Sequence, residues 1–335
     1  DRSPSRGLGD VYKRQVPEKL KSGSHVRVIA PSRSLGIISE DCRRIARARF
    51  AEMGLTVSFG KNVEMTDRFL SSPVRARLDD LHEAFADKSV DAVLTAIGGF
   101  NAVELLSQID YGLIKANPKI FCGFSDITAL SCAIYAKTGL VTYSGPHFSS
   151  FGMLKGFDYT LDCFKKCFFQ KEAFALCPSP EWSDDPWYLN QDERHFVRND
   201  GIWAIRPGKA EGTIIGGNLG LLDELKGTPY FPDIRDCILF AEHCAEHDAW
   251  VFNRNLQSLC LHPDFKRVRA LVIGRFEPQN QMNRVQLEEI LLSKKELEGL
   301  PIIANADFGH TAPIFTFPVG GRGFVDGERI ELTCF

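Results

Sequence analysis

The residue whose surroundings most favour chemistry is Ser125. A Gly-x-Ser turn that ends at Ser125 joins a predicted buried strand to a predicted helix, as in a nucleophile elbow. The backbone N–H of Asp126 would then face an oxyanion, and a second donor could come from the Gly98-Gly99 turn after another strand. Because Ile127 stands where the full hydrolase motif has a second glycine, a helix-capping serine is the alternative interpretation.

Two further side chains could complete a hydrolytic site with Ser125. His310 follows an apolar strand in a Gly-His loop, a position suited to a general base. Glu242 ends another apolar strand, where a buried carboxylate needs a partner. An imidazole that Glu242 orients would provide one, as the third member of a triad. A hydrogen-bonded histidine and an ordinary ion pair are the alternatives for these two residues.

Residues 243–247 provide competing candidates and a metal alternative. His243 and His247 compete with His310 for the base, and Glu246 competes with Glu242 for the acid. The three residues also resemble the inverted zinc motif H-x-x-E-H. Since the segment directly follows a strand, only its later part could be helical, and the triad is favoured.

The elements that must position Ser125 alternate strands and helices along the first half of the chain. The predicted strands are 26–31, 55–58, 90–97 and 119–124, and the predicted helices are 40–53, 74–86, 102–109 and 127–137. This βαβα order predicts an α/β fold with a parallel sheet and helices on both faces.

The second half predicts a smaller α/β domain that carries Glu242 and His310. Its predicted strands are 210–215, 237–241, 270–274, 301–304 and 329–332, and its predicted helices are 253–261 and 285–292. We expect an N-terminal domain at 20–170, a connecting loop at 171–207 and the C-terminal domain at 208–335. The loop contains Trp182 and Trp187 among Pro, Asp and Asn residues, and a loop of that length is usually functional or disordered.

Composition narrows the class of protein. Of 335 residues, 40 are Lys or Arg and 43 are Asp or Glu, which gives a formal charge of −3 and no basic footprint for nucleic acid. No apolar run is long enough to cross a bilayer. The ten cysteines include no CxxC pair, which fits reduced thiols in the cytoplasm and no structural zinc. Residues 1–19 are interpreted as a leader or non-native tail, outside the fold.

Six segments in this order resemble the family of serine peptidases that contains murein LD-carboxypeptidases and the microcin C immunity peptidases. They are Val28–Ser32, Gly98–Ala102, Gly123–Thr128, Gly216–Leu219, Leu239–Glu242 and Asp307–Thr311. These segments are spread over nearly the whole chain after residue 20. The resemblance implies a flavodoxin-like N-terminal domain, a smaller α/β C-terminal domain, and a homodimer without metal or cofactor.

The resemblance also implies roles for individual residues. Ser125 would be the nucleophile, His310 the general base and Glu242 the residue that orients it. The backbone of Gly99 and Asp126 would form the oxyanion hole, and Gly98 would bind the substrate beside it. The family more often has an acidic residue where His243 stands.

We expect the connecting loop at 171–207, an insert, to indicate which substrate of the family this chain cleaves. Trp182 and Trp187, together with the runs 253–259 and 305–311, look more like the microcin immunity branch. That branch cleaves the bond joining a peptide or amino acid to a modified nucleotide, whereas the cell-wall branch removes D-alanine from a murein tetrapeptide. An α/β-hydrolase esterase and a non-catalytic flavodoxin-like binding module are the alternatives from other classes, since a sheet alone proves no chemistry.

Overall fold

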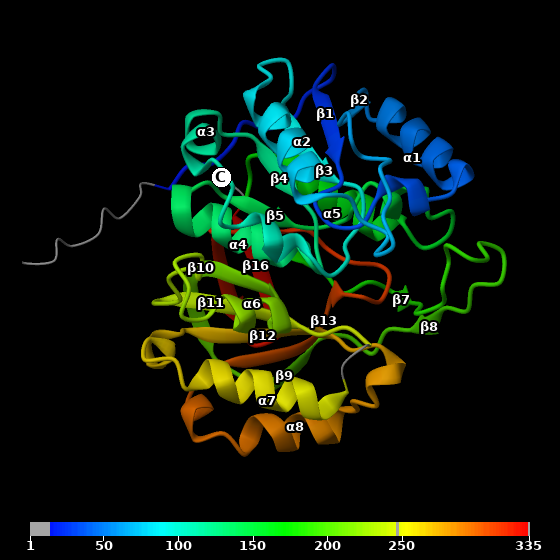
Figure 1. Ribbon diagram of the computed structural model, residues 1–335. Helices are drawn as coiled ribbons and strands as arrows, with labels where there is room; N and C mark the ends of the chain where they lie inside the picture. Colours follow the sequence, from blue (N-terminus) through cyan, green and yellow to red (C-terminus); the bar gives the residue numbers. More distant parts are fainter. Residues whose placement is uncertain (1–13, 246–247, 334–335) are drawn as a thin grey trace, which may run out of the picture.

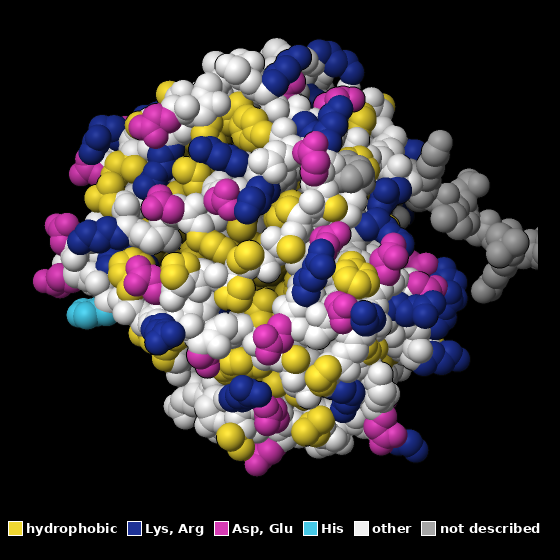
Figure 2. Space-filling view, turned by 180° about the vertical axis from the view of Figure 1, so that it is seen from behind, with side chains coloured by type: hydrophobic (Ala, Val, Ile, Leu, Met, Phe, Trp, Pro, Cys, Tyr) yellow, Lys and Arg dark blue, Asp and Glu magenta, His cyan; other side chains and the backbone are white. Residues whose placement is uncertain are grey.

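A computed structural model describes residues 14–245 and 248–333 of the chain. It contains two main sheets with helices packed against them (Figure 1). Within the described residues, no helix is both long enough and apolar enough to cross a membrane. On the face shown in Figure 2, acidic and basic side chains are interspersed, so neither sign of charge dominates it.

The N-terminal sheet has the strand order β14-β5-β4-β3-β1-β2. Strands β1 to β5 are parallel to their neighbours, in the order 2-1-3-4-5 of flavodoxin-like folds. The strands are β1 (His25–Ile29), β2 (Thr56–Phe59), β3 (Ala92–Thr95), β4 (Ile120–Cys122), β5 (Thr142–Ser144) and β14 (Phe317–Val319). The flavodoxin-like prediction is confirmed, and β14 adds an antiparallel edge from the far end of the chain.

Five helices accompany this sheet in the described part of the chain. They are α1 (Glu40–Glu52), α2 (Val74–Ala86), α3 (Tyr111–Ala116), α4 (Ile127–Thr138) and α5 (Asp158–Phe169). The single helix predicted at 102–109 is wrong. A 3-10 helix covers only Ala102–Leu105, and Asp110 then caps α3 by accepting a hydrogen bond from the Leu113 backbone, which starts a separate helix.

The C-terminal sheet has the strand order β6-β16-β15-β10-β11-β12-β13-β9. Its strands are β6 (Phe174–Leu176), β9 (Trp203–Arg206), β10 (Lys209–Asn218), β11 (Cys237–Glu242), β12 (Ala270–Arg275), β13 (Ile302–Gly309), β15 (Arg322–Asp326) and β16 (Arg329–Thr333). Helices α6 (Leu219–Leu225), α7 (Ala249–Cys260) and α8 (Arg284–Leu292) belong to this half. Figure 1 shows α7 and α8 side by side below the sheet.

The segment 171–207 is not the plain connecting loop that the sequence predicts. Its two ends form the edge strands β6 and β9 of the C-terminal sheet, paired with β16 and β13. Between them, β7 (Glu181–Trp182) and β8 (Val197–Arg198) form a small antiparallel hairpin. These strands are two to four residues long, too short to show a hydrophobic period.

The two sheets meet where α4 packs on the end of β10. The Asn218 backbone N–H donates to Thr128 Oγ1 at 2.9 Å. A Cβ on Gly217 would lie 2.5 Å from the same oxygen, so glycine is required for this approach. The contact sets the start of α4, just after Ser125, against the half that carries Glu242 and His310.

Candidate active site

Ser125 occupies the sharp turn between β4 and α4 in a left-handed conformation, with φ of 59°. A non-glycine residue in this region is strained and is held there by its surroundings. Gly123 permits the turn, because a Cβ at that position would lie 2.2 Å from Thr95 Oγ1. The geometry is that of a nucleophile elbow at the start of a helix.

His310 and Glu242 come from neighbouring regions of the C-terminal sheet. His310 directly follows β13, and Glu242 is the last residue of β11. Gly309 lets the two side chains meet, since a Cβ there would lie 3.2 Å from Glu242 Oε2. Both residues therefore emerge at the carboxyl ends of parallel strands, where ligands bind in such sheets.

The three predicted side chains form one hydrogen-bonded chain. His310 Nε2 lies 2.9 Å from Ser125 Oγ, and His310 Nδ1 lies 2.8 Å from Glu242 Oε2. Glu242 is 3% exposed. Burial raises the pKa of this carboxyl, but the charge and hydrogen bond of His310, together with His243 and a hydrogen bond from Asn218, outweigh burial and hold the pKa below its usual value. An ionised carboxylate can thus orient the imidazole, which faces the serine hydroxyl.

The backbone donors expected for an oxyanion hole lie in the same cavity. Ser125, His310, Gly99 and Asp126 all line a hollow of about 260 Å³. Within the described residues, the N–H groups of Gly99 and Asp126 make no hydrogen bond, so both can donate to a ligand. Gly98 does not line the hollow but lies directly behind Ser125, with a Cβ there only 3.1 Å from Ser125 Cβ.

The Asp126 side chain has a structural role that the sequence analysis did not predict. Its buried carboxylate accepts hydrogen bonds from Ser32 Oγ and from the Ala102 backbone N–H, the latter at 2.9 Å. Ser32 follows β1, and Ala102 follows the Gly98-Gly99 turn. The carboxylate therefore ties both loops to the start of α4.

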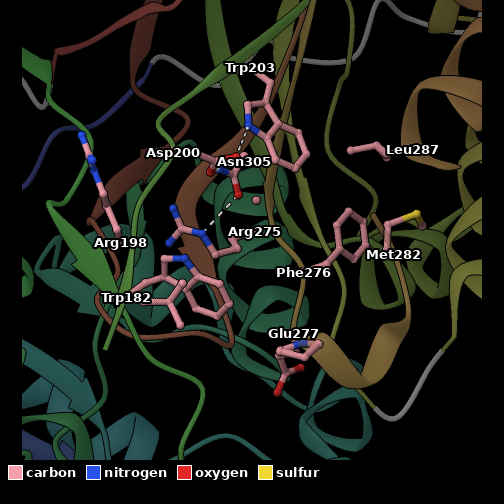
Figure 3. Close-up of a pocket in the computed structure, with 13 residues that line it drawn as sticks. Trp182, Arg198, Asp200, Trp203, Arg275, Phe276, Glu277, Met282, Leu287 and Asn305 are labelled. Atoms are coloured by element: carbon pink, nitrogen blue, oxygen red, sulfur yellow. Dashed lines mark hydrogen bonds between the residues drawn. The ribbon is translucent and has the colours of Figure 1, made fainter. Parts of the chain in front are cut away.

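A second cavity of about 390 Å³ adjoins the first, because Glu277 lines both. Figure 3 shows Trp182, Trp203, Phe276 and Met282 around it. The Arg275 guanidinium lies over the Trp182 ring, 5.2 Å from its centroid. The cavity thus combines flat aromatic faces with polar groups.

The two tryptophans of the insert have different surroundings. Trp182 belongs to β7 and lines the aromatic cavity. Trp187 is not among the residues of that lining and packs against the hydrophobic core. Trp203, which the sequence analysis did not single out, takes a place opposite in the cavity because it begins the edge strand β9.

A buried polar network fixes the wall that carries Trp182. Arg275 Nη1 donates to Asp307 Oδ1 at 2.6 Å, and both side chains are at most 4% exposed. Asp307 also accepts from the Ser179 backbone N–H at 2.7 Å. The backbones of Ser183 and Ala312 exchange two hydrogen bonds, of 2.8 and 2.9 Å. The hairpin of the insert is therefore anchored to the loop that begins with His310.

The structure describes only one of the three residues of the zinc alternative. His243 Nε2 lies 3.3 Å from Asn255 Nδ2, and Glu246 and His247 lie outside the described residues. Among the residues that are described, no group of three or more His, Cys, Asp or Glu side chains could hold a metal ion. The alternative stays a hypothesis.

Comparison with known proteins identifies the family. The model of the LD-carboxypeptidase N-terminal domain matches residues 26–145, and that of the C-terminal domain matches residues 211–325. This chain belongs to the LD-carboxypeptidase family. It is a serine peptidase, and its hydrolase class was correctly predicted from the sequence.

Relatives of this chain match most of its length. "Putative carboxypeptidase YocD" of Bacillus subtilis is 47% identical over 90% of this chain and 93% of its own. "Probable murein peptide carboxypeptidase" of Bacillus subtilis is 32% identical over 91% and 90%. "Microcin C7 self-immunity protein MccF" of Escherichia coli is 31% identical over 84% of each chain.

Solved structures agree with this fold. The MccF-like protein of Bacillus anthracis has a TM-score of 0.94 at 48% identity, and the match covers 95% of this chain and 99% of that protein's chain. MccF in complex with aspartyl sulfamoyl adenosine has a TM-score of 0.86 at 29% identity, with coverage of 95% and 98%. The resemblance stated from the sequence is confirmed.

Proposed function

We propose that this carboxypeptidase cleaves the C-terminal amide-type bond of a peptidyl or aminoacyl nucleotide. Ser125 is the nucleophile, His310 the general base and Glu242 the residue that orients the base. The observation that carries the proposal is the hydrogen-bonded chain of these three side chains at a hollow that adjoins the cavity lined by Trp182 and Trp203.

The first half of the reaction forms an acyl-enzyme. Ser125 Oγ attacks the carbonyl carbon while His310 Nε2 takes the hydroxyl proton, and the N–H groups of Gly99 and Asp126 donate to the resulting oxyanion. His310 then gives that proton to the leaving nitrogen as the carbon–nitrogen bond breaks. Glu242 stabilises the imidazolium in between.

The second half restores the serine. A water molecule attacks the acyl carbon and loses a proton to His310, and the oxyanion again lies at the Gly99 and Asp126 N–H groups. Collapse of this intermediate breaks the ester, returns the proton to Ser125 Oγ and releases the carboxylic acid. Overall, one water molecule is consumed, and its atoms are divided between the released amine and the carboxylic acid.

The adjoining aromatic cavity supports a nucleotide leaving group. Aromatic side chains stack on nucleobases, and Trp182 offers a face there that Arg275 backs. The similarity to MccF, which has been solved with aspartyl sulfamoyl adenosine, points the same way. Glu277 lies at the junction, where the leaving group would extend from the hollow beside Ser125 into the aromatic cavity.

Removal of the terminal residue from a murein tetrapeptide is the second candidate. The relative named for murein peptides is about as similar, at 32% identity, as MccF at 31%. Mass spectrometry of the products from an aminoacyl-sulfamoyl adenosine and from a murein tetrapeptide, side by side, decides between them. We expect turnover of the first, and exclusive turnover of the second would reassign the substrate.

We also propose that the enzyme is a cytoplasmic homodimer acting on small substrates. Its described cysteines are thiols, and burial raises the pKa of Cys132 to about 12, so that thiol stays protonated and unreactive at neutral pH. Light scattering on the purified protein measures the subunit number, and cell fractionation locates the enzyme. A monomer, or protein in an extracytoplasmic fraction, would contradict these two assignments.

A further inference from the structure

His147 is a buried histidine behind the active site that the proposed mechanism does not use. It is 3% exposed and follows β5. Its Nδ1 lies 2.7 Å from Thr95 Oγ1, at the end of β3. Its ring stacks on Phe124, the residue before the nucleophile, with centroids 4.3 Å apart. One imidazole thus contacts both the end of β3 and the turn that carries Ser125.

The other edge of the ring faces Gly98. A Cβ placed on Gly98 would lie 3.4 Å from His147 Nε2 and 3.1 Å from Ser125 Cβ, so the ring and the nucleophile both pack against the side of Gly98 where a side chain would project. Within the described residues, the buried Nε2 has no hydrogen-bond partner. Because such an atom is costly to bury, its retention needs a reason.

The carbonyl of Gly98 is held independently by Arg33. The backbone N–H and the Nε of Arg33 both donate to Gly98 O, each at 3.3 Å. In a planar trans peptide, the N–H of the next residue points opposite to that carbonyl. The position of Gly98 therefore sets the direction of the Gly99 N–H, the proposed oxyanion donor.

We propose that His147 is a positioning residue of the oxyanion hole, anchored to Thr95 through Nδ1 and holding Gly98 against Ser125. The proposal rests on the proposed function, which assigns Ser125 as nucleophile and Gly99 as donor. The ring is neutral in this role. Burial above all, together with the charges of His310 and Arg33, lowers the pKa of His147 to about 3. No positive charge then opposes the imidazolium that forms on His310.

Two amide substitutions separate the edges of the ring. His147→Asn places an amide near Nδ1, which keeps the contact with Thr95 but leaves the space behind Gly98 open. His147→Gln reaches the Nε2 position and fills that space. We expect kcat of the Asn variant to fall by about ten- to a hundredfold, since a displacement of about 1 Å at a reacting centre costs that much. KM should stay unchanged, and the Gln variant should recover part of kcat.

A control and a second variant keep the test decisive. His262→Gln, on a histidine that contacts Phe231 and Asp264 instead, should leave kcat unchanged. Thr95→Val keeps the ring but removes its anchor, and should lower kcat in the same direction if His147→Asn fails to fold. An unchanged kcat in His147→Asn or in Thr95→Val overturns the proposal. Equal losses in the Asn and Gln variants that follow falling Tm also overturn it.

Backbone dynamics provide a readout that needs no substrate. The NMR order parameters of Gly98 and Gly99 should fall in His147→Asn relative to the wild type. Turnover that persists in Ser125→Ala would defeat the proposed function, yet these order parameters would still decide whether His147 positions the turn. Unchanged values in a folded variant would count against the positioning role.

Discussion

At the residue scale, the site depends on three side chains that are far apart in sequence. Ser125, Glu242 and His310 meet through hydrogen bonds of 2.8 and 2.9 Å. Ser125 and His310 follow buried strands and Glu242 ends one, which is why the sequence alone could select them. The backbone strain at Ser125, with φ of 59°, is the feature that distinguishes it from an ordinary helix cap.

Loss of either proton-transfer partner should stop the reaction. Ser125→Ala and His310→Ala should each lower kcat by about 10⁴-fold or more, because members of a triad act as a unit. The double variant should be little worse than either single one. Rates on the substrate identified by mass spectrometry measure this, and a Ser125→Ala enzyme with most of its turnover would exclude the serine mechanism.

Glu242 predicts a pH dependence of stability. Its folded-state pKa lies below its usual value, so the ionised carboxylate stabilises the fold at neutral pH and loses this effect as pH falls through the folded pKa. Glu242→Gln should therefore be less stable than the wild type at pH 7, and the difference should shrink in acid. It should also slow kcat strongly, because His310 loses its charge partner. Urea unfolding at pH 7 and pH 3 checks the first expectation, and a constant difference would contradict it.

At the element scale, the two tryptophans of the insert differ in position, since Trp182 belongs to β7 and Trp187 to the segment that joins β7 to β8. Trp182 lines the aromatic cavity, whereas Trp187 packs on the core. Trp182→Ala should lower kcat/KM on an aminoacyl nucleotide about ten- to a hundredfold, as stacking is worth about 1–3 kcal/mol per base. Cleavage of a murein tetrapeptide should barely change.

Trp187→Ala is the matched control for that comparison. It should affect thermal stability more than it affects the ratio of rates on the two substrates. If Trp182→Ala lowers both rates equally, the ring is structural and the nucleotide assignment loses its main support.

The wall of the aromatic cavity depends on a buried ion pair. Asp307→Asn leaves Arg275 as an uncompensated buried charge, and breaking such pairs costs about 3–5 kcal/mol. We expect a lower free energy of unfolding and a less ordered hairpin at 179–200. Denaturant unfolding and limited proteolysis measure these effects. A variant with wild-type stability would show that the pair is not essential to the hairpin.

The parts of the site that sequence reasoning missed share one property: they act through three-dimensional contacts without a local pattern. His147 stands alone between a proline and a phenylalanine, and Trp203 begins a four-residue edge strand. Ser125, by contrast, has a strand, a glycine and a helix around it. The parallel sheet was predictable because its central strands β3 and β4 are buried at every position and lie in largely apolar runs, whereas β6 and β9 are too short to show any period.

At the scale of the whole molecule, a metal-independent mechanism predicts that chelators have no effect. EDTA should leave the rate unchanged, because His310 activates the nucleophile. His247→Ala should stay active for the same reason. Stoichiometric zinc in the purified protein, with activity lost on its removal, would support the alternative site at residues 243–247.

The strand β14 has a consequence for biosynthesis. It pairs with β5 although about 175 residues separate them along the chain. On a ribosome that adds about 5–20 residues per second, the β5 edge of the N-terminal sheet stays unpaired for on the order of 10 to 30 seconds until β14 is synthesised. During that time the edge is open to pairing with a neighbouring nascent chain. The nucleophile is thus synthesised early, on a sheet that only the last part of translation can close.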